Sequence, residues 1–138
     1  MVTMLTHGKY LLDTCVCIAF IKKKASVVDH LRKVGKLDCK ISEITVAELL
    51  YGAFNSGREE HFDDVTEIVR DFEQYQVSGS LREYARLRWI LKEKGKPVDH
   101  LDLFIAATAL TEGLILVTGN VDHFNRIPGL KIENWMEE

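Results

Sequence analysis

Two short apolar runs that end in polar residues most constrain the fold of this chain. They are "KYLLDT" at residues 9–14 and "GLILVTGN" at residues 113–120. Continuous apolar runs of this length are typical of strands buried on both faces, as in parallel sheets. Parallel strands need long crossovers, and helices usually supply them. We therefore expect an α/β fold, with a parallel sheet flanked by helices on both faces.

The segment between the two runs contains helical spacing interrupted by short strands. The spacing predicts helices over residues 16–23, 26–33, 43–54, 60–72, 80–95 and 101–110. In the third helix, the apolar residues that recur at helical spacing are Ile44, Ala47, Leu50, Tyr51 and Phe54. Ser80 and Glu83 match a capping box. The stretches "CKIS", "YQVSG" and "GLKIENW" are expected as further strands, the last one at an edge.

Length and charge limit the classes of protein to which the chain can belong. With 138 residues and no linker-like or repetitive segment, residues 1–138 are expected to form a single domain. A net charge of −3 gives no overall attraction to nucleic acid or anionic membranes, so any such binding depends on local patches. The N-terminal "MVTMLTHG" has no signal-peptide pattern, and three cysteines provide no disulfide framework. These features favour the cytoplasm.

Four polar residues occupy positions where burial is expected. Asp13 ends the first apolar run, and Glu48 lies within the apolar stretch "TVAELLYG". Asp102 opens the most apolar helix, and Asn120 follows the last strongly apolar strand. Each has a plainer interpretation, as a helix cap, an exposed helix residue or a turn residue. Together they fall near the carboxyl ends of parallel strands, where sites gather in such sheets.

A cluster of carboxylates is unfavourable unless a cation neutralises it. Oxygen ligands favour a hard ion, Mg²⁺ or Mn²⁺, held through one or two carboxylates and completed by water and substrate phosphate. Asp13 and Asp102 are the expected metal ligands. The chemistry associated with such sites is hydrolysis of a phosphodiester.

Four stretches make the chain resemble PIN-domain ribonucleases, specifically the VapC toxins of bacterial type II toxin–antitoxin modules. They are "YLLDT", "SEITVAELLYGA", "GKPVDHLDLFIAATAL" and "LILVTGNVDHFNRIPGLKIENW", in the order found in that family. The resemblance implies a PIN-like domain with a five-stranded parallel sheet. It also implies that Asp13, Glu48, Asp102 and Asn120 are the catalytic residues of a magnesium-dependent endoribonuclease, with Mn²⁺ as a substitute.

The resemblance further implies the partners of the chain: an RNA substrate, a cognate VapB-type antitoxin, a homodimer and a higher assembly with the antitoxin, with no membrane. Initiator tRNA, other tRNAs and a ribosomal RNA loop are substrates among relatives, and this sequence favours none of them. Thr118, Asp122 and Asp99 are secondary candidates at the site. Arg82 and Arg86, one helical turn apart in a basic stretch, are candidate RNA contacts, although a solvated helix face or a subunit interface explains either of them better.

The chain departs from the family pattern at two positions. Cys15 stands where relatives commonly have Asn, and Asn120 stands where an Asp is common. The second departure leaves open a catalytically weakened PIN scaffold that only binds RNA or an antitoxin. Cys15 also argues against haloacid-dehalogenase-like phosphatases, which need a second Asp there. Cys15 and Cys17 lack partner ligands for a soft-metal site and are expected to be packing residues.

Overall fold

The computed structural model describes residues 9–137, and the segment "MVTMLTHG", examined above for a signal peptide, lies outside them. A five-stranded sheet is formed by β1 (Tyr10–Leu12), β2 (Cys39–Ser42), β3 (Glu73–Tyr75), β4 (Ile115–Val117) and β5 (Ile132–Glu133). The strand order is β3-β2-β1-β4-β5, and every neighbouring pair is parallel. The expected five-stranded parallel sheet is therefore confirmed.

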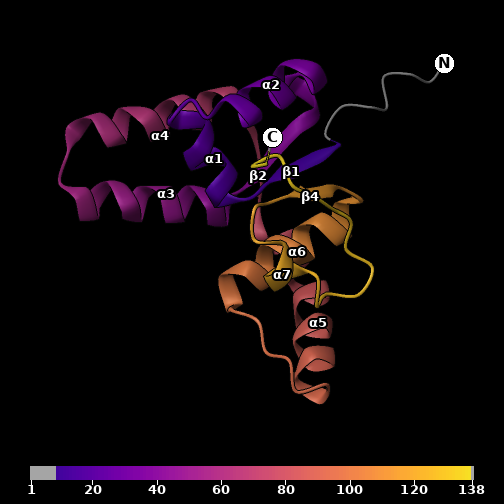
Figure 1. Ribbon diagram of the computed structural model, residues 1–138. Coiled ribbons are helices and arrows are strands. Elements are labelled where there is room, and N and C mark those ends of the chain that lie inside the picture. The colour runs from indigo at the N-terminus through magenta and orange to yellow at the C-terminus, as the bar shows by residue number, and fades with distance from the viewer. Residues whose placement is uncertain (1–8, 138) are drawn as a thin grey trace.

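The helices cover both faces of this sheet (Figure 1). Their bounds are α1 (Thr14–Ile21), α2 (Ala25–Val34), α3 (Glu43–Ser56), α4 (Glu59–Asp71), α5 (Leu81–Glu93), α6 (His100–Glu112) and α7 (Val121–Phe124). Short 3-10 segments cover Lys36–Asp38 and Val77–Ser80. Within the described part of the chain, no helix is long and apolar enough to cross a lipid bilayer.

Strand β1 lies at the centre and contributes to two cores because successive strand side chains point to opposite faces. Tyr10 and Leu12 pack into a core with residues of α1, α2, α3 and α4. Leu11 packs into a second core with residues of α5, α6 and the segment that follows β4. All three residues are buried, which explains why "YLL" is apolar without alternation.

The strand order reverses at β1, and this reversal places the candidate site. The chain runs from β1 outward to β2 and β3, and then returns to the other side of β1 for β4 and β5. Ligands of open parallel sheets bind in the crevice at the carboxyl ends of the strands at such a reversal. Asp13 directly follows β1, and Thr118 directly follows β4. The polar residues that end the two apolar runs are therefore neighbours.

Helix α3 forms as predicted, but the apolar residues that recur at helical spacing do not make up its buried face. Its buried residues are Thr45, Leu49 and Ala53. Tyr51 and Phe54 are 71% and 73% exposed. Helical spacing identifies residues that share a face, but it does not tell which neighbour covers that face. Helix α3 thus presents an apolar strip to the outside of the chain.

Two boundary predictions also need correction. Strand β3 forms at Glu73–Tyr75, directly after α4, because it pairs there with β2; the predicted "YQVSG" begins at its last residue. Ser80 does not form the predicted capping box. Its buried hydroxyl donates to the Val77 carbonyl at 2.9 Å and accepts a 3.3 Å hydrogen bond from Thr108 of α6. Tertiary packing thus determines the start of α5.

Candidate active site

Asp13 joins β1 to α1 and uses its two carboxylate oxygens differently. Its extended backbone makes it the N-cap of α1, and Oδ1 accepts the Thr14 N–H at 2.8 Å. Oδ2 accepts a 2.7 Å hydrogen bond from the Thr118 hydroxyl. The residue is only 6% exposed. The capping interpretation is therefore correct for one oxygen, while the other oxygen lies toward the end of β4.

Thr118 links this carboxylate to the segment that carries Asn120. The Thr118 side chain is fully buried. Its hydroxyl oxygen accepts a 3.0 Å hydrogen bond from the Asn120 N–H, and the same hydroxyl donates its own hydrogen bond to Asp13. The Asp13 N–H also donates to the Val117 carbonyl at 2.9 Å, which continues the β1–β4 pairing. Asn120 itself is exposed, at the start of α7. Thr118 thus positions Asp13 against the turn after β4.

Glu48 approaches from α3 and is held by a hydroxyl group. The Thr14 hydroxyl donates to Glu48 Oε1 at 2.6 Å, and its oxygen lies 3.1 Å from that of Thr45. Thr45 is fully buried and precedes Glu48 by three residues, so the two share a face of α3. Thr14 follows Asp13 directly. A single hydroxyl therefore connects the β1 end to the carboxylate of α3.

Asp102 lies in the first turn of α6 and carries the most perturbed carboxyl group of the site. Burial raises its pKa to about 6, and the negative charges of Asp13, Asp99 and Glu48 raise it as well. His123 opposes this effect: its Nε2 lies 2.9 Å from Asp102 Oδ2, although the two groups are not aligned for a hydrogen bond. The four carboxylates therefore share one electrostatic environment.

Cys15, the departure from the family pattern, lies within the site. Its sulfur accepts the Gly119 N–H at 3.4 Å and lies 3.6 Å from Asp13 Oδ2 and 3.7 Å from Thr118 Oγ1. Burial and the Asp13 charge raise the pKa of the thiol, so it stays protonated near neutrality. Cys17 points away into the core, as expected. Cys15 thus contacts Asp13 and Thr118, the residues that follow β1 and β4, so it does more than fill space in the core.

The remaining predicted site residues lie at the start of α6, on α7 and on α5. Asp99 caps α6 by accepting the Leu101 N–H at 3.1 Å, and Asp122 is exposed on α7. Arg82 and Arg86 lie on the exposed side of α5, where Arg86 donates two hydrogen bonds to Glu83. That ion pair weakens the case for Arg86 as a phosphate contact.

Our sequence analysis missed the hydroxyl residues that orient the acids. Thr14 and Thr45 both contact the Glu48 side of the site. A signal was present, because Thr14 follows the acid that ends β1 and Thr45 lies one helical turn from Glu48. The contact of His123 with Asp102 joins segments 21 residues apart, and local spacing could not reveal it.

The donor set of the site fits a hard divalent cation. Burial, and then the negative charges of Asp13, Asp99 and Glu48, raise the pKa of Asp102, and a cation would neutralise these carboxylates. Across residues 9–137, no three His, Cys, Asp or Glu side chains are arranged to hold a metal ion alone. An ion at Asp13 and Asp102 would therefore need water or substrate oxygens, which is the usual situation for Mg²⁺.

Comparisons with known proteins agree with this fold. The family model for the PIN domain matches residues 10–130. The "tRNA(fMet)-specific endonuclease VapC" of Salmonella typhimurium is 37% identical over 133 residues, which cover 92% of this chain and 98% of the relative. "Ribonuclease VapC2" of Rickettsia felis is 36% identical over 130 residues, covering 91% of this chain and 97% of that protein.

A solved structure extends the agreement to three dimensions. The chain matches a crystal structure of VapBC2 from Rickettsia felis, bound to a DNA fragment from its promoter, with a TM-score of 0.85. The match has 35% sequence identity and covers 91% of this chain and 98% of the other. The fold, the acidic residues at the strand ends and these similarities lead to one conclusion: the chain belongs to the PIN-domain family and, within it, to the VapC group.

Proposed function

We propose that this chain is a divalent-metal-dependent endoribonuclease and the toxin of a type II toxin–antitoxin module. The observation that carries the proposal is geometric: where the strand order reverses, the buried Asp13 carboxylate is hydrogen-bonded to Thr118, and the adjacent Thr14 hydroxyl donates to Glu48 of α3. The raised pKa of the half-buried Asp102, caused first by burial and then by the charge of Asp13, supports it. We assign Mg²⁺ as the natural ion, with Mn²⁺ as a substitute, because its ligands are oxygens. The similarity to a tRNA-specific endonuclease and to ribonucleases supports RNA as the substrate.

In this proposal the side chains have separate roles. A bound divalent ion offsets the negative charge that develops on the phosphodiester oxygens during hydrolysis. Asp13 and Asp102 hold the ion. Glu48, whose Oε1 is occupied by the Thr14 hydroxyl, uses Oε2 to orient the attacking water and to accept its proton. Asn120 contacts the substrate through its neutral amide. This role is compatible with an ion that Asp13 and Asp102 hold.

The proposed partners are a VapB-type antitoxin and a second copy of the chain, in a higher assembly in the cytoplasm. Solved structures similar to this chain are those of VapBC complexes, some of them bound to DNA. The exposed apolar strip of α3 supports a homodimer, since Tyr51 and Phe54 lie largely in solvent in a single chain. Exposed Trp89 on α5 fits the same role.

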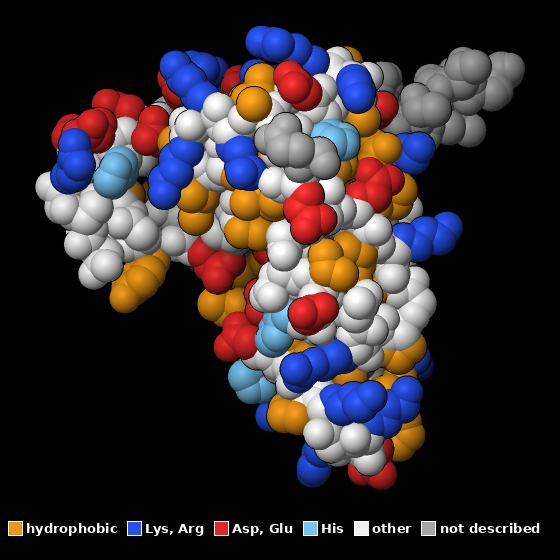
Figure 2. All heavy atoms as spheres, viewed as in Figure 1, with side chains coloured by type: hydrophobic (Ala, Val, Ile, Leu, Met, Phe, Trp, Pro, Cys, Tyr) orange, Lys and Arg blue, Asp and Glu red, His pale blue; other side chains and the backbone are white. Residues whose placement is uncertain are grey.

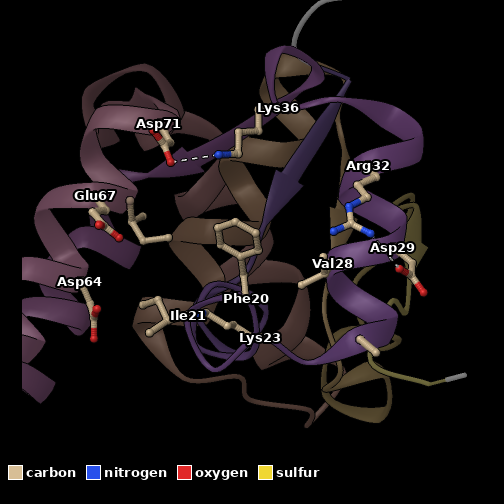
Figure 3. Close-up of a pocket in the computed structure, with 12 residues that line it drawn as sticks. Phe20, Ile21, Lys23, Val28, Asp29, Arg32, Lys36, Asp64, Glu67 and Asp71 are labelled. Atoms are coloured by element: carbon tan, nitrogen blue, oxygen red, sulfur yellow. Dashed lines mark hydrogen bonds and ion pairs between the residues drawn. The ribbon is translucent and has the colours of Figure 1, made fainter.

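A groove of about 790 Å³ between α1, α2 and α4 is the proposed binding site for the antitoxin (Figure 3). Phe20 and Val28 lie on its apolar floor. Acidic side chains of α4 line one wall, where Lys36 bonds to Asp71 at 3.0 Å, and Asp29 and Arg32 of α2 lie on the opposite side. An apolar floor between charged walls suits an amphipathic helix.

A second function, a PIN scaffold that binds RNA or an antitoxin without cleavage, is favoured by one observation. Asn120 replaces an acid common in the family, and its exposed side chain adds no negative charge to the site. Fewer charges around a divalent ion lower its affinity. The two functions therefore differ in whether the ion binds.

Titration calorimetry with Mg²⁺ separates them. We expect binding to the wild-type chain, at least about tenfold weaker binding to Asp13→Asn, and unchanged binding to Asp63→Asn. Asp63 is a matched control because it is an exposed acid of α4 outside the site. Absence of Mg²⁺ binding to the wild-type chain, with RNA binding intact, would establish the scaffold instead. A short DNA-binding protein encoded beside the gene would support the toxin role.

A further inference from the structure

A small cavity outside the acidic cluster lies between α5 and the start of α6. Its volume is about 340 Å³, within the range of small-ligand sites. It is lined by Arg88, Leu91, Lys92, Pro97, Val98, His100 and Leu103. None of these residues has a role in the proposed hydrolysis, so the cavity needs its own explanation.

The cavity has an apolar floor and a cationic rim. Leu91 and Leu103 form the floor and are each about 1% exposed. Arg88 and Lys92, one helical turn apart on α5, are exposed at the rim. An apolar floor accepts a flat ring, and two adjacent cations accept an anion beside it. A nucleotide with an unpaired base combines both chemistries.

Aromatic contacts hold this rim in place. The Tyr84 ring stacks on Phe104, with centroids 3.9 Å apart and an angle of 6° between the planes. The Tyr84 hydroxyl lies 2.7 Å from His100 Nδ1 and receives a longer contact of 3.5 Å from Arg88. Arg88 and His100, on opposite sides of the rim, are thus connected through one packed ring. A rim ordered before binding loses less conformational entropy when a ligand arrives.

A chain of contacts connects the cavity to the acidic site. His123 of α7 lies 2.9 Å from Asp102, and Arg126, three residues later, donates to the Pro97 carbonyl at 3.2 Å. Pro97 lines the cavity. The segment after β4 therefore contacts a catalytic carboxyl with one residue and the cavity loop with another. A single strand of RNA that leaves the acidic site over this segment reaches the cavity directly.

The charge distribution favours a polyanion along this path. Residues 81–96 contain six basic and two acidic residues in a chain whose net charge is −3. In Figure 2, Lys and Arg side chains gather over the lower end of the molecule, which Figure 1 identifies as α5 and the loop after it. This local surplus supplies the phosphate attraction that the net charge lacks.

We propose that this cavity binds one unpaired nucleotide of the RNA substrate, adjacent to the phosphodiester at Asp102. The base lies on the floor formed by Leu91 and Leu103, and Arg88 and Lys92 contact its phosphate. The inference rests on the proposed ribonuclease function. In this proposal the cavity also selects single-stranded over double-stranded RNA, because the bases of an A-form duplex are stacked and cannot enter a pocket.

The test measures binding of a fluorescent single-stranded RNA to the full chain by anisotropy, with EDTA present to prevent cleavage. The Arg88→Ala/Lys92→Ala variant should bind at least about tenfold more weakly. The slope of log affinity against log salt should fall by about 0.7, the value for one neutralised phosphate. Lys33→Ala/Arg70→Ala removes the same charge from α2 and α4 and should bind within about twofold of wild type.

A third variant tests the pocket separately from the charge. Val98→Trp fills the cavity without changing any charge, so it should weaken binding about tenfold and leave the salt slope unchanged. Thermal unfolding checks that each variant folds. Equal weakening by the two double variants, or unchanged binding by Val98→Trp, would overturn the proposal. A wild-type chain that binds RNA in this pattern but never cleaves it with Mg²⁺ would instead refute the nuclease function alone.

Discussion

The Thr118 hydroxyl donates a 2.7 Å hydrogen bond to Asp13 Oδ2, and this bond joins the ends of two neighbouring parallel strands at the candidate site. Both residues are buried, and the Thr118 oxygen also accepts the Asn120 N–H. A hydrogen bond to a buried charged group is worth more than one between neutral groups. The bond therefore fixes the direction in which Asp13 presents its carboxylate.

Thr118→Val removes this bond while keeping the size of the side chain. We expect the free energy of unfolding to fall by about 1.5–3 kcal/mol, because a charged acceptor loses its buried donor. Urea denaturation measures the change. Thr66→Val is the control, since the exposed Thr66 hydroxyl donates only to the Phe62 carbonyl of its own helix. Equal destabilisation by both variants would contradict the role given to Thr118.

The stability of the metal-free chain should depend on pH through Asp102. Its folded-state pKa of about 6 lies above the unfolded value of about 3.9, so ionised Asp102 destabilises the fold. This penalty is complete above pH 6 and disappears as the pH falls through 6 toward 4. Asp102→Asn should therefore stabilise the chain at pH 7.5, by an amount on the order of 2 kcal/mol, and have little effect near pH 4.

Urea denaturation in EDTA at the two pH values tests this expectation. Asp63→Asn again serves as the control, because Asp63 is exposed on α4. Destabilisation by Asp102→Asn at pH 7.5 would show that the carboxylates are not in mutual repulsion in the metal-free protein.

Cys15 should be replaceable by a residue that still accepts a hydrogen bond. Cys15→Ser keeps an acceptor for the Gly119 N–H, whereas Cys15→Ala removes it. We expect Mg²⁺ affinity within about threefold of wild type for the Ser variant, and about 2–12-fold weaker for the Ala variant, the range that one hydrogen bond supplies. Calorimetry measures both. Identical affinities would mean that Cys15 only fills space.

The exposed strip of α3 should mediate self-association. Tyr51→Glu/Phe54→Glu places charges on this strip and should convert the dimer to a monomer in analytical ultracentrifugation, because charged groups are unfavourable in an apolar interface. Leu37→Glu is the matched control, since Leu37 is 73% exposed, as is Phe54, but lies outside α3. A dimer that persists in the double variant would place the interface elsewhere.

The sequence predicted the two central strands well because β1 and most of β4 are buried. An apolar run without alternation leaves few alternatives to a parallel strand, and the polar residue after it must lie at the strand end. Asp13 and Thr118 follow such runs and are neighbours in the structure. The proximity of Asp13 to the end of β4 could be inferred from this rule alone.

The sequence predicted poorly what depends on contacts between distant segments. The spacing of Tyr51 and Phe54 identified a common face of α3 but could not show that both side chains stay largely exposed, although the Phe54 ring packs against Phe62 of α4. The Ser80 hydroxyl formed tertiary contacts in place of the predicted cap. The contact of His123 with Asp102 had no local signal either. Packing between elements decided all three.

The most direct test of the central claim is cleavage of RNA by the purified full chain with and without Mg²⁺. We predict cleavage that EDTA abolishes and added Mg²⁺ restores, and a loss of at least about 100-fold in rate for Asp13→Asn and Asp102→Asn. Asp63→Asn should cleave at the wild-type rate. Equal cleavage by wild type and both site variants, or cleavage unaffected by EDTA, would contradict the account.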